Sequence, residues 1–507
     1  MIYGFYATPE YIIDSNGKIL NSVKDLFDYT QSINCFYNLN FNVACILKLF
    51  EVTGLKELYE TTETNWNIYT LKYIKDKYFS IRNKQTSKYV EFCDISQYIV
   101  WHVAMGDKAY SLQKAKRAKY IGEQIYNALT KLGLKVRTMT SPIRVYEKSY
   151  FNRLDLPTLK DLPNNVAEFA YNCCHGGWIE VFKKGHFEDT WDYDLSSAYP
   201  YQLSKLKELR FGQWVESKSY QSDADYGFVL GDVTINSNFS PIMYDGKELT
   251  FTPMGRWRAY LTKQEIDAIY KYNLGTFEII YGYWWVPKQS VYPLKIHIDK
   301  LYAKKEIFDN YDKHVVKVIL NGMWGKLLEV QQGEPGRHFN PVWGSLVESQ
   351  TRLEVFKSCV ENKIIPLSIA VDGVLTDKPL NLTMGGLGNW KQTLNCPALV
   401  ISSGIVALRD KDKKHDFSLD YSWLMEQIKE NPNEAKYTMT KLSPISLDKA
   451  INTDMDDLGT IKESTRSIDV TYESKRLYPE YPTCGKELLS KVYNSVALDT
   501  SIIKNIF

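Results

Sequence analysis

Cysteine is scarce in this sequence, and none of it is spaced for a metal site. The 507 residues include eight cysteines, two of which, Cys173 and Cys174, are adjacent, and no CxxC pair occurs. Structural zinc sites need closely spaced pairs of this kind. We therefore exclude a zinc-ribbon type of protein and expect free thiols in a reducing compartment.

Long apolar runs and a strong excess of charge are also missing. No stretch of about 18 apolar residues occurs, the length that a membrane-spanning helix needs. The first residues lack the basic segment of a signal peptide. The formal net charge of +2 excludes a wholly basic nucleic-acid coat, but it allows a local basic channel. We expect a cytoplasmic protein of about three domains that has no membrane partner.

Acidic and basic residues recur in three separated stretches. The first is a predicted strand, 191–195, that runs into Asp194-Leu-Ser-Ser-Ala-Tyr-Pro200. The others are Lys317-Val-Ile-Leu-Asn321-Gly-Met-Trp-Gly325 and Ala370-Val-Asp372-Gly-Val374. Two carboxylates can hold divalent metal ions about 3.5–4 Å apart, and cations on a helix can bind a triphosphate. An acid, a helix with Lys and Asn, and a second acid are what nucleotidyl transfer needs.

The middle stretch belongs to a longer helical pattern. Residues 296–328 are predicted to form one helix, and polar or aromatic side chains recur in it at intervals of 3, 4 or 8. The spacing places five of them near one face: Lys305, Lys313, Lys317, Asn321 and Trp324. A row of ammonium groups there suits a triphosphate, because lysine acts as a compact point charge.

These stretches resemble motifs of family B DNA polymerases, closest to the protein-primed, phage-like branch. Residues 194–200 resemble the first palm motif, DxxSLYP, with Ala198 in place of Leu. Residues 317–325 resemble KxxxNSxYG, with Gly322 in place of Ser and Trp324 in place of Tyr. The resemblance implies a template-directed DNA polymerase that adds dNTPs to a primer 3′-hydroxyl with two Mg²⁺ ions, or with Mn²⁺.

The resemblance also implies roles for single residues. Tyr199 would lie beneath the incoming sugar and select deoxynucleotides, and Lys317 with Lys313 would neutralise the leaving pyrophosphate. The catalytic residues would be Asp194, Asp372 and Lys317, and the metal ligands Asp194, the carbonyl of Leu195 and Asp372. The nucleotide-binding residues would be Tyr199, Lys305, Lys313, Lys317, Asn321 and Trp324.

The third stretch departs from its family motif, DTDS. One alignment places Asp372 at the second acid, the direct metal ligand, and leaves Ala370 at the first. The other alignment places Asp372 at the first acid and Val374 at the second, which would leave the site without its direct metal ligand and severely impaired. The first alignment is favoured, and it implies a rate lowered by roughly 10–100-fold if the missing acid acts from outside the metal's direct ligands.

The N-terminal third predicts strands at 2–8, 33–37 and 89–93 with packed helices, including one at 112–132. The segment Tyr37-Asn-Leu-Asn-Phe-Asn42 resembles the HNLxFD motif of the family's 3′–5′ exonuclease domain, with Asn42 in place of the metal-binding Asp. The DxE motif would fall at Gly4-Phe-Tyr6, and YxxxD at Tyr120–Gln124, which contains only Glu123. Hard cations need anionic oxygen ligands. We therefore expect an RNase H-like fold without nuclease activity.

Two further stretches indicate contacts with DNA. Gly176-Gly177 resembles the YxGG motif between the exonuclease and polymerase domains, with Cys174 in place of Tyr. Lys475-Arg476 resembles a late KR stretch and suggests phosphate contact. Either pair can equally be a plain turn or a solvated loop.

Together these observations predict an α/β and α+β multidomain protein. The expected parts are an RNase H-like domain (1–150), a linker with the GG motif (151–182), a palm with an insertion (183–295), fingers (296–335), palm again (336–395) and a thumb or C-terminal region (396–507). The expected partners are primer-template DNA, dNTPs and a priming protein or other replication proteins, in the host cytoplasm if the chain is viral. The alternative is a weak or inactive polymerase-like module that binds nucleic acid or a replication partner.

Overall fold

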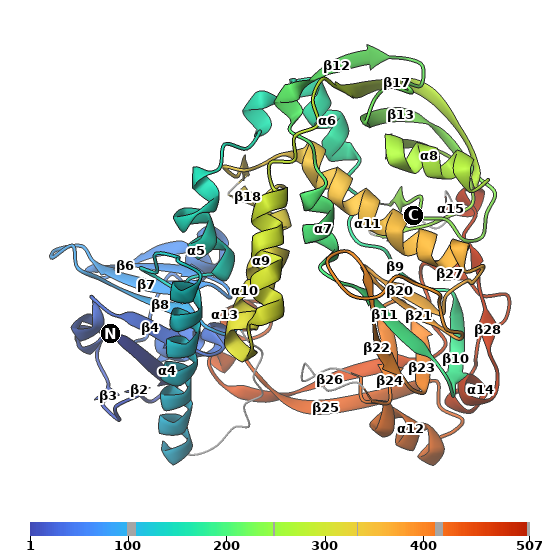
Figure 1. Ribbon diagram of the computed structural model, residues 1–507. Coiled ribbons are helices and arrows are strands. Elements are labelled where there is room, and N and C mark those ends of the chain that lie inside the picture. The colour runs from blue at the N-terminus through green and yellow to red at the C-terminus, as the bar shows by residue number, and fades with distance from the viewer. Residues whose placement is uncertain (99–107, 247–248, 332, 411–418, 504–507) are drawn as a thin grey trace. The chain divides into compact units, whose positions relative to one another are not determined.

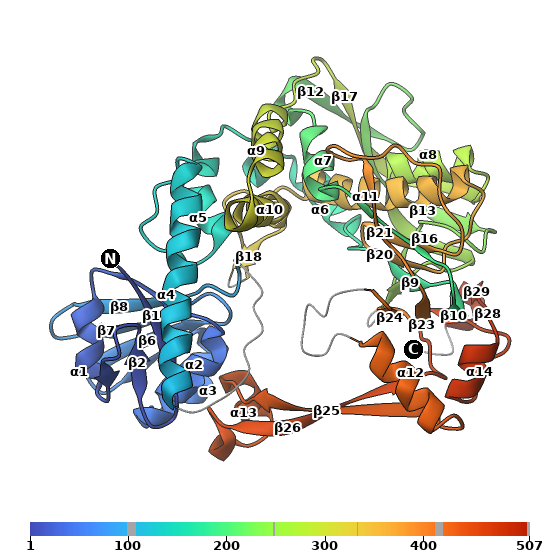
Figure 2. The same ribbon diagram turned by 60° about the horizontal axis from the view of Figure 1, so that its bottom comes forward.

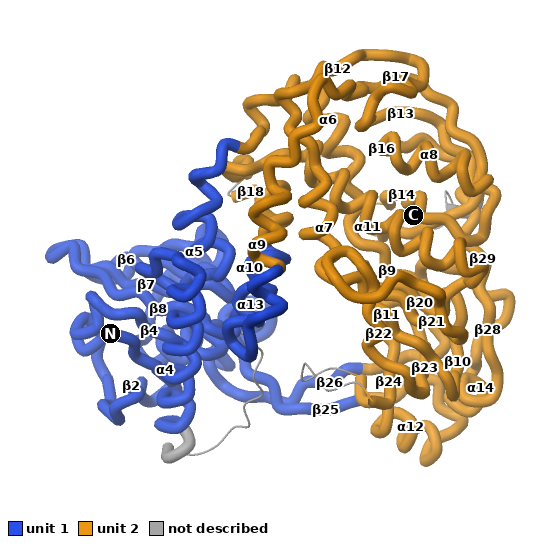
Figure 3. The backbone as a smooth tube through the Cα atoms, viewed as in Figure 1, with its two compact units in different colours: residues 1–155, 303–322, 439–466 blue, residues 156–302, 323–438, 467–507 orange. Residues whose placement is uncertain are grey.

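The computed structural model describes residues 1–98, 108–246, 249–331, 333–410 and 419–503 (Figure 1). The chain divides into two compact units, which Figure 3 colours separately. Unit 1 comprises residues 1–155, 303–322 and 439–466, and unit 2 comprises 156–302, 323–438 and 467–507. Among the described residues, no helix combines the length and apolar character needed to cross a bilayer.

Unit 1 is built on an eight-stranded sheet with the strand order β3-β2-β1-β4-β8-β7-β6-β5. β1, β4 and β8 are parallel neighbours, and the others pair antiparallel. Three of the strands were predicted from the sequence, and the structure confirms them. The strands are β1 (Ile2–Ala7), β2 (Ile12–Asp14), β3 (Ile19–Leu20), β4 (Ile33–Phe36), β5 (Glu63–Trp66), β6 (Tyr69–Ile74), β7 (Tyr78–Asn83) and β8 (Tyr89–Asp94).

Five helices accompany this sheet, and one of them lies directly on β1 (Figure 2). A Cβ atom on Gly4 of β1 would come within 2.0 Å of the Ala115 carbonyl oxygen of α4. The missing side chain therefore lets the two backbones meet. The helices are α1 (Val23–Leu26), α2 (Leu39–Leu49), α3 (Leu55–Thr61), α4 (Lys108–Lys131) and α5 (Pro142–Ser149).

A two-stranded ribbon, β25 (Lys436–Pro444) and β26 (Ile461–Asp469), ends in a tip that belongs to unit 1. Helix α13 (Leu447–Asn452) in this tip buries Leu447 and Ala450 in the same apolar core as the eight-stranded sheet. The Asp448 carboxylate pairs with Lys75 at 2.8 Å. The tip is therefore fastened to unit 1 by a shared core and an ion pair.

The predicted single helix 296–328 is wrong, because the structure contains two helices there. α9 (Lys295–Ile307) ends before α10 (Asn310–Gly325) begins, and Asn310 has a left-handed φ of 46°. Asparagine adopts this conformation more readily than most residues, and it breaks a helix. Lys305 therefore lies on α9, apart from the helix face that carries Lys313 and Lys317.

Unit 2 contains a five-stranded sheet in the order β22-β11-β21-β20-β9. Helix α11 packs against α6, α7 and α8, and the Asn340 side chain caps its first turn by accepting a hydrogen bond from Trp343 N at 3.1 Å. The elements are β9 (Ile179–Val181), β11 (Trp191–Leu195), β20 (Ser368–Ala370), β21 (Gly373–Thr376), β22 (Trp390–Asn395), α6 (Asn164–Asn172), α7 (Ala198–Ser204), α8 (Lys263–Lys271) and α11 (Pro341–Glu361).

Two four-stranded sheets, in the orders β12-β17-β13-β16 and β24-β23-β10-β28, complete most of unit 2. α8 packs on the first, after a capping box between Thr262 and Glu265. Their strands are β10 (Lys183–Phe187), β12 (Gly212–Ser217), β13 (Tyr226–Ile235), β16 (Gly255–Thr262), β17 (Gly275–Pro287), β23 (Ala398–Ser402), β24 (Ile405–Leu408) and β28 (Tyr493–Asn494). The smaller elements are β14 (Tyr244–Asp245), β15 (Thr250–Phe251), β18 (Val330–Gln331), β19 (Glu334–Pro335), β27 (Arg476–Leu477), β29 (Val496–Ala497), α12 (Tyr421–Glu430), α14 (Gly485–Ser490) and α15 (Thr500–Ile503).

The segment 151–182, which the sequence predicts to be a linker, includes the boundary between the two units at residues 155 and 156, and much of it is regular secondary structure. This segment contains helix α6, which packs on α11, and strand β9, which forms one edge of the five-stranded sheet. Pro163 immediately precedes α6 and Pro142 begins α5. Proline is favoured at the first position of a helix, because its fixed φ suits the helix and its missing N–H is not needed there. Pro142 and Pro163 therefore lie at the starts of helices.

Candidate functional site

Four residues form a row across four strands of the five-stranded sheet. Asp194 on β11 is directly opposite Gly373 on β21, and Gly373 is opposite Ala370 on β20. On its other side, Asp194 is opposite Lys391 on β22. Directly paired residues present their side chains to the same face. We call Ala370, Gly373, Asp194 and Lys391 the carboxylate row.

The second acid lies in a two-residue hairpin next to this row. Val371 and Asp372 connect β20 to β21, and the carbonyl oxygen of Asp372 accepts a hydrogen bond from Leu195 N at 2.9 Å. Val371 has a φ of 62°, which is strained for a β-branched residue and is characteristic of functional hairpins. The hairpin thus places Asp372 beside the Asp194-Leu195 segment.

The sheet gives an unsuitable position for a metal-binding acid at Val374, which one of the two alignments makes the second acid. Val374 pairs with Tyr193 on β11 and is only 1% exposed, within the apolar core. An acid equivalent at this position would face the core and could not reach a shared metal. The register therefore supports the alignment that leaves Ala370 at the first acid and Asp372 at the second.

The oxygen atoms near the row suit a hard divalent cation. Within the described residues, no group of three or more His, Cys, Asp or Glu side chains is arranged to hold a metal. The backbone hydrogen bond from Leu195 to Asp372 nevertheless brings the backbone segments of two acidic residues, Asp194 and Asp372, side by side, and Mg²⁺ is commonly bound by one or two carboxylates that leave positions for water and phosphate. The donor set therefore fits a metal that is shared with a phosphate substrate.

An aromatic pair adjoins the acids. The ring of Tyr199 on α7 stacks on Trp324, in the last turn of α10, with centroids 4.8 Å apart and planes 30° from parallel. Burial, and then the nearby carboxylates of Glu348 and Asp372, raise the pKa of Tyr199 to about 12. The phenol is therefore neutral at physiological pH, and the two rings offer an uncharged surface close to Asp372.

The loop before β22 closes against the segment that follows Asp194. Ser196 N donates to the Asn389 carbonyl oxygen at 2.8 Å, and Gly388 N donates to the Ser196 carbonyl oxygen at 2.9 Å. Gly388 has a φ of 75°, and a Cβ atom there would lie 2.2 Å from the Tyr201 ring. Glycine is thus required where the loop crosses α7.

The GG loop is held by charged residues that sequence reasoning missed. Gly176 N donates to the Glu348 carboxylate at 2.9 Å, and Arg352 donates to the Gly176 carbonyl oxygen at 2.7 Å. Arg352 also pairs with Glu265 at 2.8 Å, and both side chains are 1% exposed. Burial raises the pKa of Glu348. Charged residues four apart on one predicted helix, Glu348 and Arg352, were the available signal.

The two glycines of this loop have different surroundings. Gly177 packs against the hairpin, because a Cβ atom there would meet the Val371 side chain at 2.9 Å. Gly176 has a φ of 74°, and a Cβ atom there would have no other atom within 4 Å. The open side of the loop is therefore at Gly176, and a DNA contact there stays a prediction.

The predicted triphosphate-binding residues on α10 share one exposed face. Lys313, Lys317 and Asn321 are four residues apart and exposed, whereas Val316, Ile319 and Leu320 are buried. The spacing argument for these three residues is thus confirmed. Their role towards a nucleotide stays a prediction, as does that of Lys305 on α9.

The predicted phosphate contact of Arg476 is wrong. Its side chain is 1% exposed and pairs with the fully buried Glu180 at 3.3 Å. It also donates to the Ser495 hydroxyl at 2.6 Å and to the Asn238 carbonyl oxygen at 2.9 Å. A guanidinium with these partners is a structural element of unit 2. Lys475 is half-buried, and its contact stays a prediction.

The positions of the exonuclease motifs in unit 1 are occupied by other interactions. Asn42 is 1% exposed; its amide oxygen accepts from Ala7 N at 2.8 Å, and its nitrogen donates to the carbonyl oxygens of Tyr37 and Asn38. The Lys114 ammonium donates to the Tyr6 hydroxyl at 3.1 Å and lies over that ring. Burial lowers the pKa of Lys114 to about 8.

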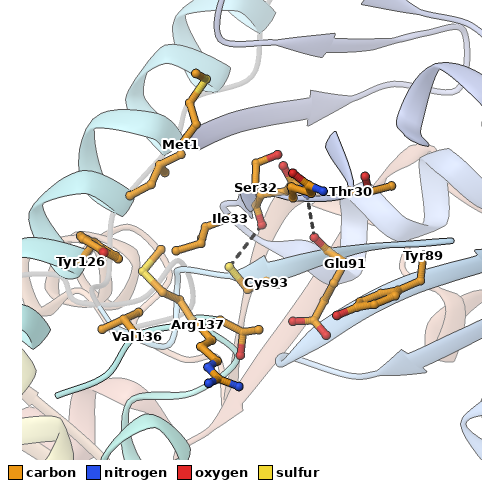
Figure 4. A pocket seen from close by; sticks show the side chains of 15 residues that line it. Met1, Thr30, Ser32, Ile33, Tyr89, Glu91, Cys93, Tyr126, Val136 and Arg137 are labelled. Atoms are coloured by element: carbon orange, nitrogen blue, oxygen red, sulfur yellow. Dashed lines mark hydrogen bonds between the residues drawn. The ribbon is translucent and has the colours of Figure 1, made fainter. Parts of the chain in front are cut away.

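A cavity of about 520 Å³ opens in unit 1 (Figure 4). It lies at the first residues of β1, β4 and β8, and its lining includes Glu91, Cys93 and Arg137. Tyr6 and Asn42 adjoin the last residue of β1, at the other end of that strand. The cavity is thus separate from Tyr6 and Asn42, two of the positions of the exonuclease motifs.

Comparisons with known proteins agree with the motifs. Residues 135–327 match the family model described as DNA polymerase type B, organellar and viral. The DNA polymerase of Acidianus bottle-shaped virus (isolate Italy/Pozzuoli) is 23% identical over 430 residues, which cover 80% of this chain and 60% of that protein. The chain thus spans about 60% of the length of this curated relative.

Solved structures of phi29 DNA polymerase share the fold. Its ternary complex with primer-template DNA and incoming nucleotide substrates matches with a TM-score of 0.59 and 13% identity, covering 92% of this chain and 98% of that one. Its binary complex with primer-template DNA matches with a TM-score of 0.60 and 13% identity, covering 92% and 99%. The resemblance that the motifs indicated is confirmed: the chain is similar to viral DNA polymerases of type B in sequence and to phi29 DNA polymerase in fold.

Proposed function

We propose that this protein is a template-directed DNA polymerase that extends a primer 3′-hydroxyl with dNTPs and lacks a proofreading nuclease. The observation that carries the proposal is the adjacency of Asp194, on β11, and Asp372, in the hairpin before the neighbouring strand β21; the two are 178 residues apart in sequence. The type B family match supports the same activity. The partners proposed are primer-template DNA, dNTPs and a priming protein or other replication proteins.

Asp194, Asp372 and the Leu195 carbonyl would hold two Mg²⁺ ions, for which Mn²⁺ can substitute. The ions would supply charge stabilisation for the attack of the primer hydroxyl on the α-phosphate. The stacked rings of Tyr199 and Trp324 would bound the sugar and base of the incoming nucleotide. Lys317, Lys313, Lys305 and Asn321 would bind its triphosphate, and positioning and charge would supply most of the rate enhancement.

The parts of the chain are proposed on the same basis. The parallel strands β1, β4 and β8 with their helices support an RNase H-like domain in residues 1–150. Residues 183–295 and 336–395 would form the palm, 296–335 the fingers and 396–507 the thumb and C-terminal region. Residues 151–182 would join the domains and add α6 and β9 to the palm.

Extension of a labelled primer on a DNA template, with Mg²⁺ and dNTPs, tests this proposal. The parent protein is expected to extend the primer, and Asp194→Asn to be slower by about 10³-fold or more, because a carboxylate metal ligand is lost. Asp189→Asn is the matched control, since Asp189 is exposed and precedes β11. Equal extension by the parent and Asp194→Asn would contradict the proposal.

The absence of an acid at Ala370 favours a second candidate, a polymerase-like module that binds nucleic acid without synthesis. The same assay separates the two when it is paired with a measurement of primer-template binding. Binding without incorporation by the parent, with either Mg²⁺ or Mn²⁺, would support the binding module and remove the enzyme.

A further inference from the structure

Lys391 contacts one of the two acids to which the proposed function assigns metal binding. Its ammonium lies 2.6 Å from Oδ2 of Asp194. The side chains are 50% and 34% exposed, so both reach the solvent face of the sheet. A pair this exposed contributes little to folding. The contact therefore calls for an explanation other than stability.

An irregularity in the sheet creates this contact. Between β11 and β22 the register runs from Asp192 opposite Leu394 to Tyr193 opposite Gln392, so Thr393 is an extra residue. Without this bulge, Gln392 would lie opposite Asp194 and Lys391 opposite Leu195. The Thr393 hydroxyl donates to Asp192, which fixes the bulge. Bulges re-aim side chains in this way and are common next to active sites.

In the carboxylate row, Asp194 has a lysine on one side and no acidic residue on the other. Ala370 and Gly373 on one side of Asp194 carry no charge, and Lys391 on the other side carries a positive one. The Lys391 ammonium, which pairs with Asp194, is thus a positive charge fixed near the two acids Asp194 and Asp372. A divalent ion that binds them is repelled by this ammonium.

We propose that Lys391 is a positioning residue that weakens metal binding by the free protein and couples metal loading to substrate. The ammonium holds Oδ2 of Asp194 and keeps its carboxylate in place. A dNTP brings a triphosphate and its own metal ion, and this added negative charge offsets the repulsion. The inference rests on the proposed function, because it assumes that Asp194 and Asp372 are the metal ligands.

Binding of Mn²⁺ to the protein alone, followed by electron paramagnetic resonance, tests the proposal without any measurement of activity. Lys391→Gln is expected to bind the ion about tenfold more tightly than the parent at moderate salt. Lys391→Arg keeps the charge and is expected to match the parent. Lys378→Gln removes an exposed charge that follows β21, outside the carboxylate row, and controls for a general change in net charge.

The outcomes separate this inference from the proposed function. Tighter Mn²⁺ binding by Lys391→Gln, with loss of the same ion in Asp194→Asn, supports both. Unchanged or weaker binding by Lys391→Gln, with loss in Asp194→Asn, overturns the role of Lys391 and leaves the polymerase proposal intact. Unaltered binding and unaltered primer extension in Asp194→Asn would overturn the metal site itself, and with it this inference.

Discussion

Both units contain a sheet with motif positions that bear metal-binding acids in family B polymerases, but the two sheets treat those positions differently. In unit 2, the carboxylate row presents Asp194 beside two small residues, Gly373 and Ala370. In unit 1, Gly4 lies against the backbone of α4, and Asn42 is enclosed by its own hydrogen bonds. The Ala370 position is open to solvent, whereas the Gly4 and Asn42 positions are enclosed by the protein.

The comparison shows two kinds of position that lack an acid: one is exposed to solvent, and the other is packed against the protein. At Ala370 the side chain is exposed, so an acid could be added without moving other atoms. At Gly4 a Cβ atom would come within 2.0 Å of Ala115 O, so an acid could not be added without moving α4. The Gly4 and Asn42 positions of unit 1 are therefore packed against other parts of the protein, whereas the Ala370 position of unit 2 is open to solvent.

The largest effect is expected at the second acid. Asp372→Asn should slow primer extension by about 10³-fold or more while primer-template binding persists, because a metal ligand is removed from a partly exposed hairpin. Asp377→Asn is its control, since Asp377 pairs with Lys183 just beyond β21. Incorporation rates at saturating dNTP measure both. If Asp372→Asn extends primers at the rate of the parent, unit 2 does not contain the accessible metal site that the comparison between the units assumes.

Restoring an acid in unit 1 should destabilise the protein without creating a nuclease. Asn42→Asp loses two hydrogen bonds that the amide nitrogen donates and buries a carboxylate among carbonyl oxygens. We expect a loss of about 3 kcal/mol in the free energy of unfolding. Denaturant unfolding measures the loss, and release of nucleotides from single-stranded DNA with Mn²⁺ measures nuclease activity. If this variant degrades single-stranded DNA and the parent does not, the claim that the Asn42 position is closed to a ligand would be contradicted.

Adding an acid in unit 2 should have the opposite outcome. Ala370→Asp places a carboxylate in the carboxylate row on an exposed position, so the unfolding free energy should change by no more than about 0.5 kcal/mol. The rate at limiting Mg²⁺ should rise by about tenfold, if the restored group acts from outside the direct ligands. Titration of the extension rate with Mg²⁺ measures this. A large loss of stability would show that this position is as closed as Asn42.

The smallest effect concerns the buried lysine of unit 1. Since burial lowers the pKa of Lys114 from 10.5 to about 8, the unfolded chain binds more protons between these values, and the stability of the parent should rise with pH across that window. Lys114→Met should be more stable than the parent by about 1 kcal/mol at pH 7. The difference should vanish towards pH 10 in thermal unfolding. A difference that does not change with pH would mean that Lys114 carries no burial cost.

Local sequence patterns predicted much of this fold because their causes are local. The strand 191–195 and the long helix α4 follow from alternation and helical periodicity. The eight cysteines are free thiols, as expected. The spacing of the motifs also predicted the pair Asp194 and Asp372. The motifs at strand ends and hairpins follow one another in a fixed order along the chain, so the sequence alone can identify them.

The failures arose where distant residues decide the structure. Arg476 looked like a phosphate ligand, but its partner Glu180 is 296 residues away. The break between α9 and α10 depends on a single left-handed residue, Asn310, inside an otherwise periodic pattern. Lys391 could not be assigned to the site, because one bulged residue, Thr393, decides whether Lys391 or Gln392 faces Asp194.

The central claim is that Asp194 and Asp372 share one metal site in unit 2 and that unit 1 has none. Cleavage of the backbone by Fe²⁺ and ascorbate, with Fe²⁺ substituting for Mg²⁺, tests this most directly, since the radicals cut the chain close to the bound ion. We expect two sets of fragments, cut near residues 194 and 372, that disappear in Asp194→Asn. Cuts confined to unit 1, or cuts near only one of the two acids, would contradict the account.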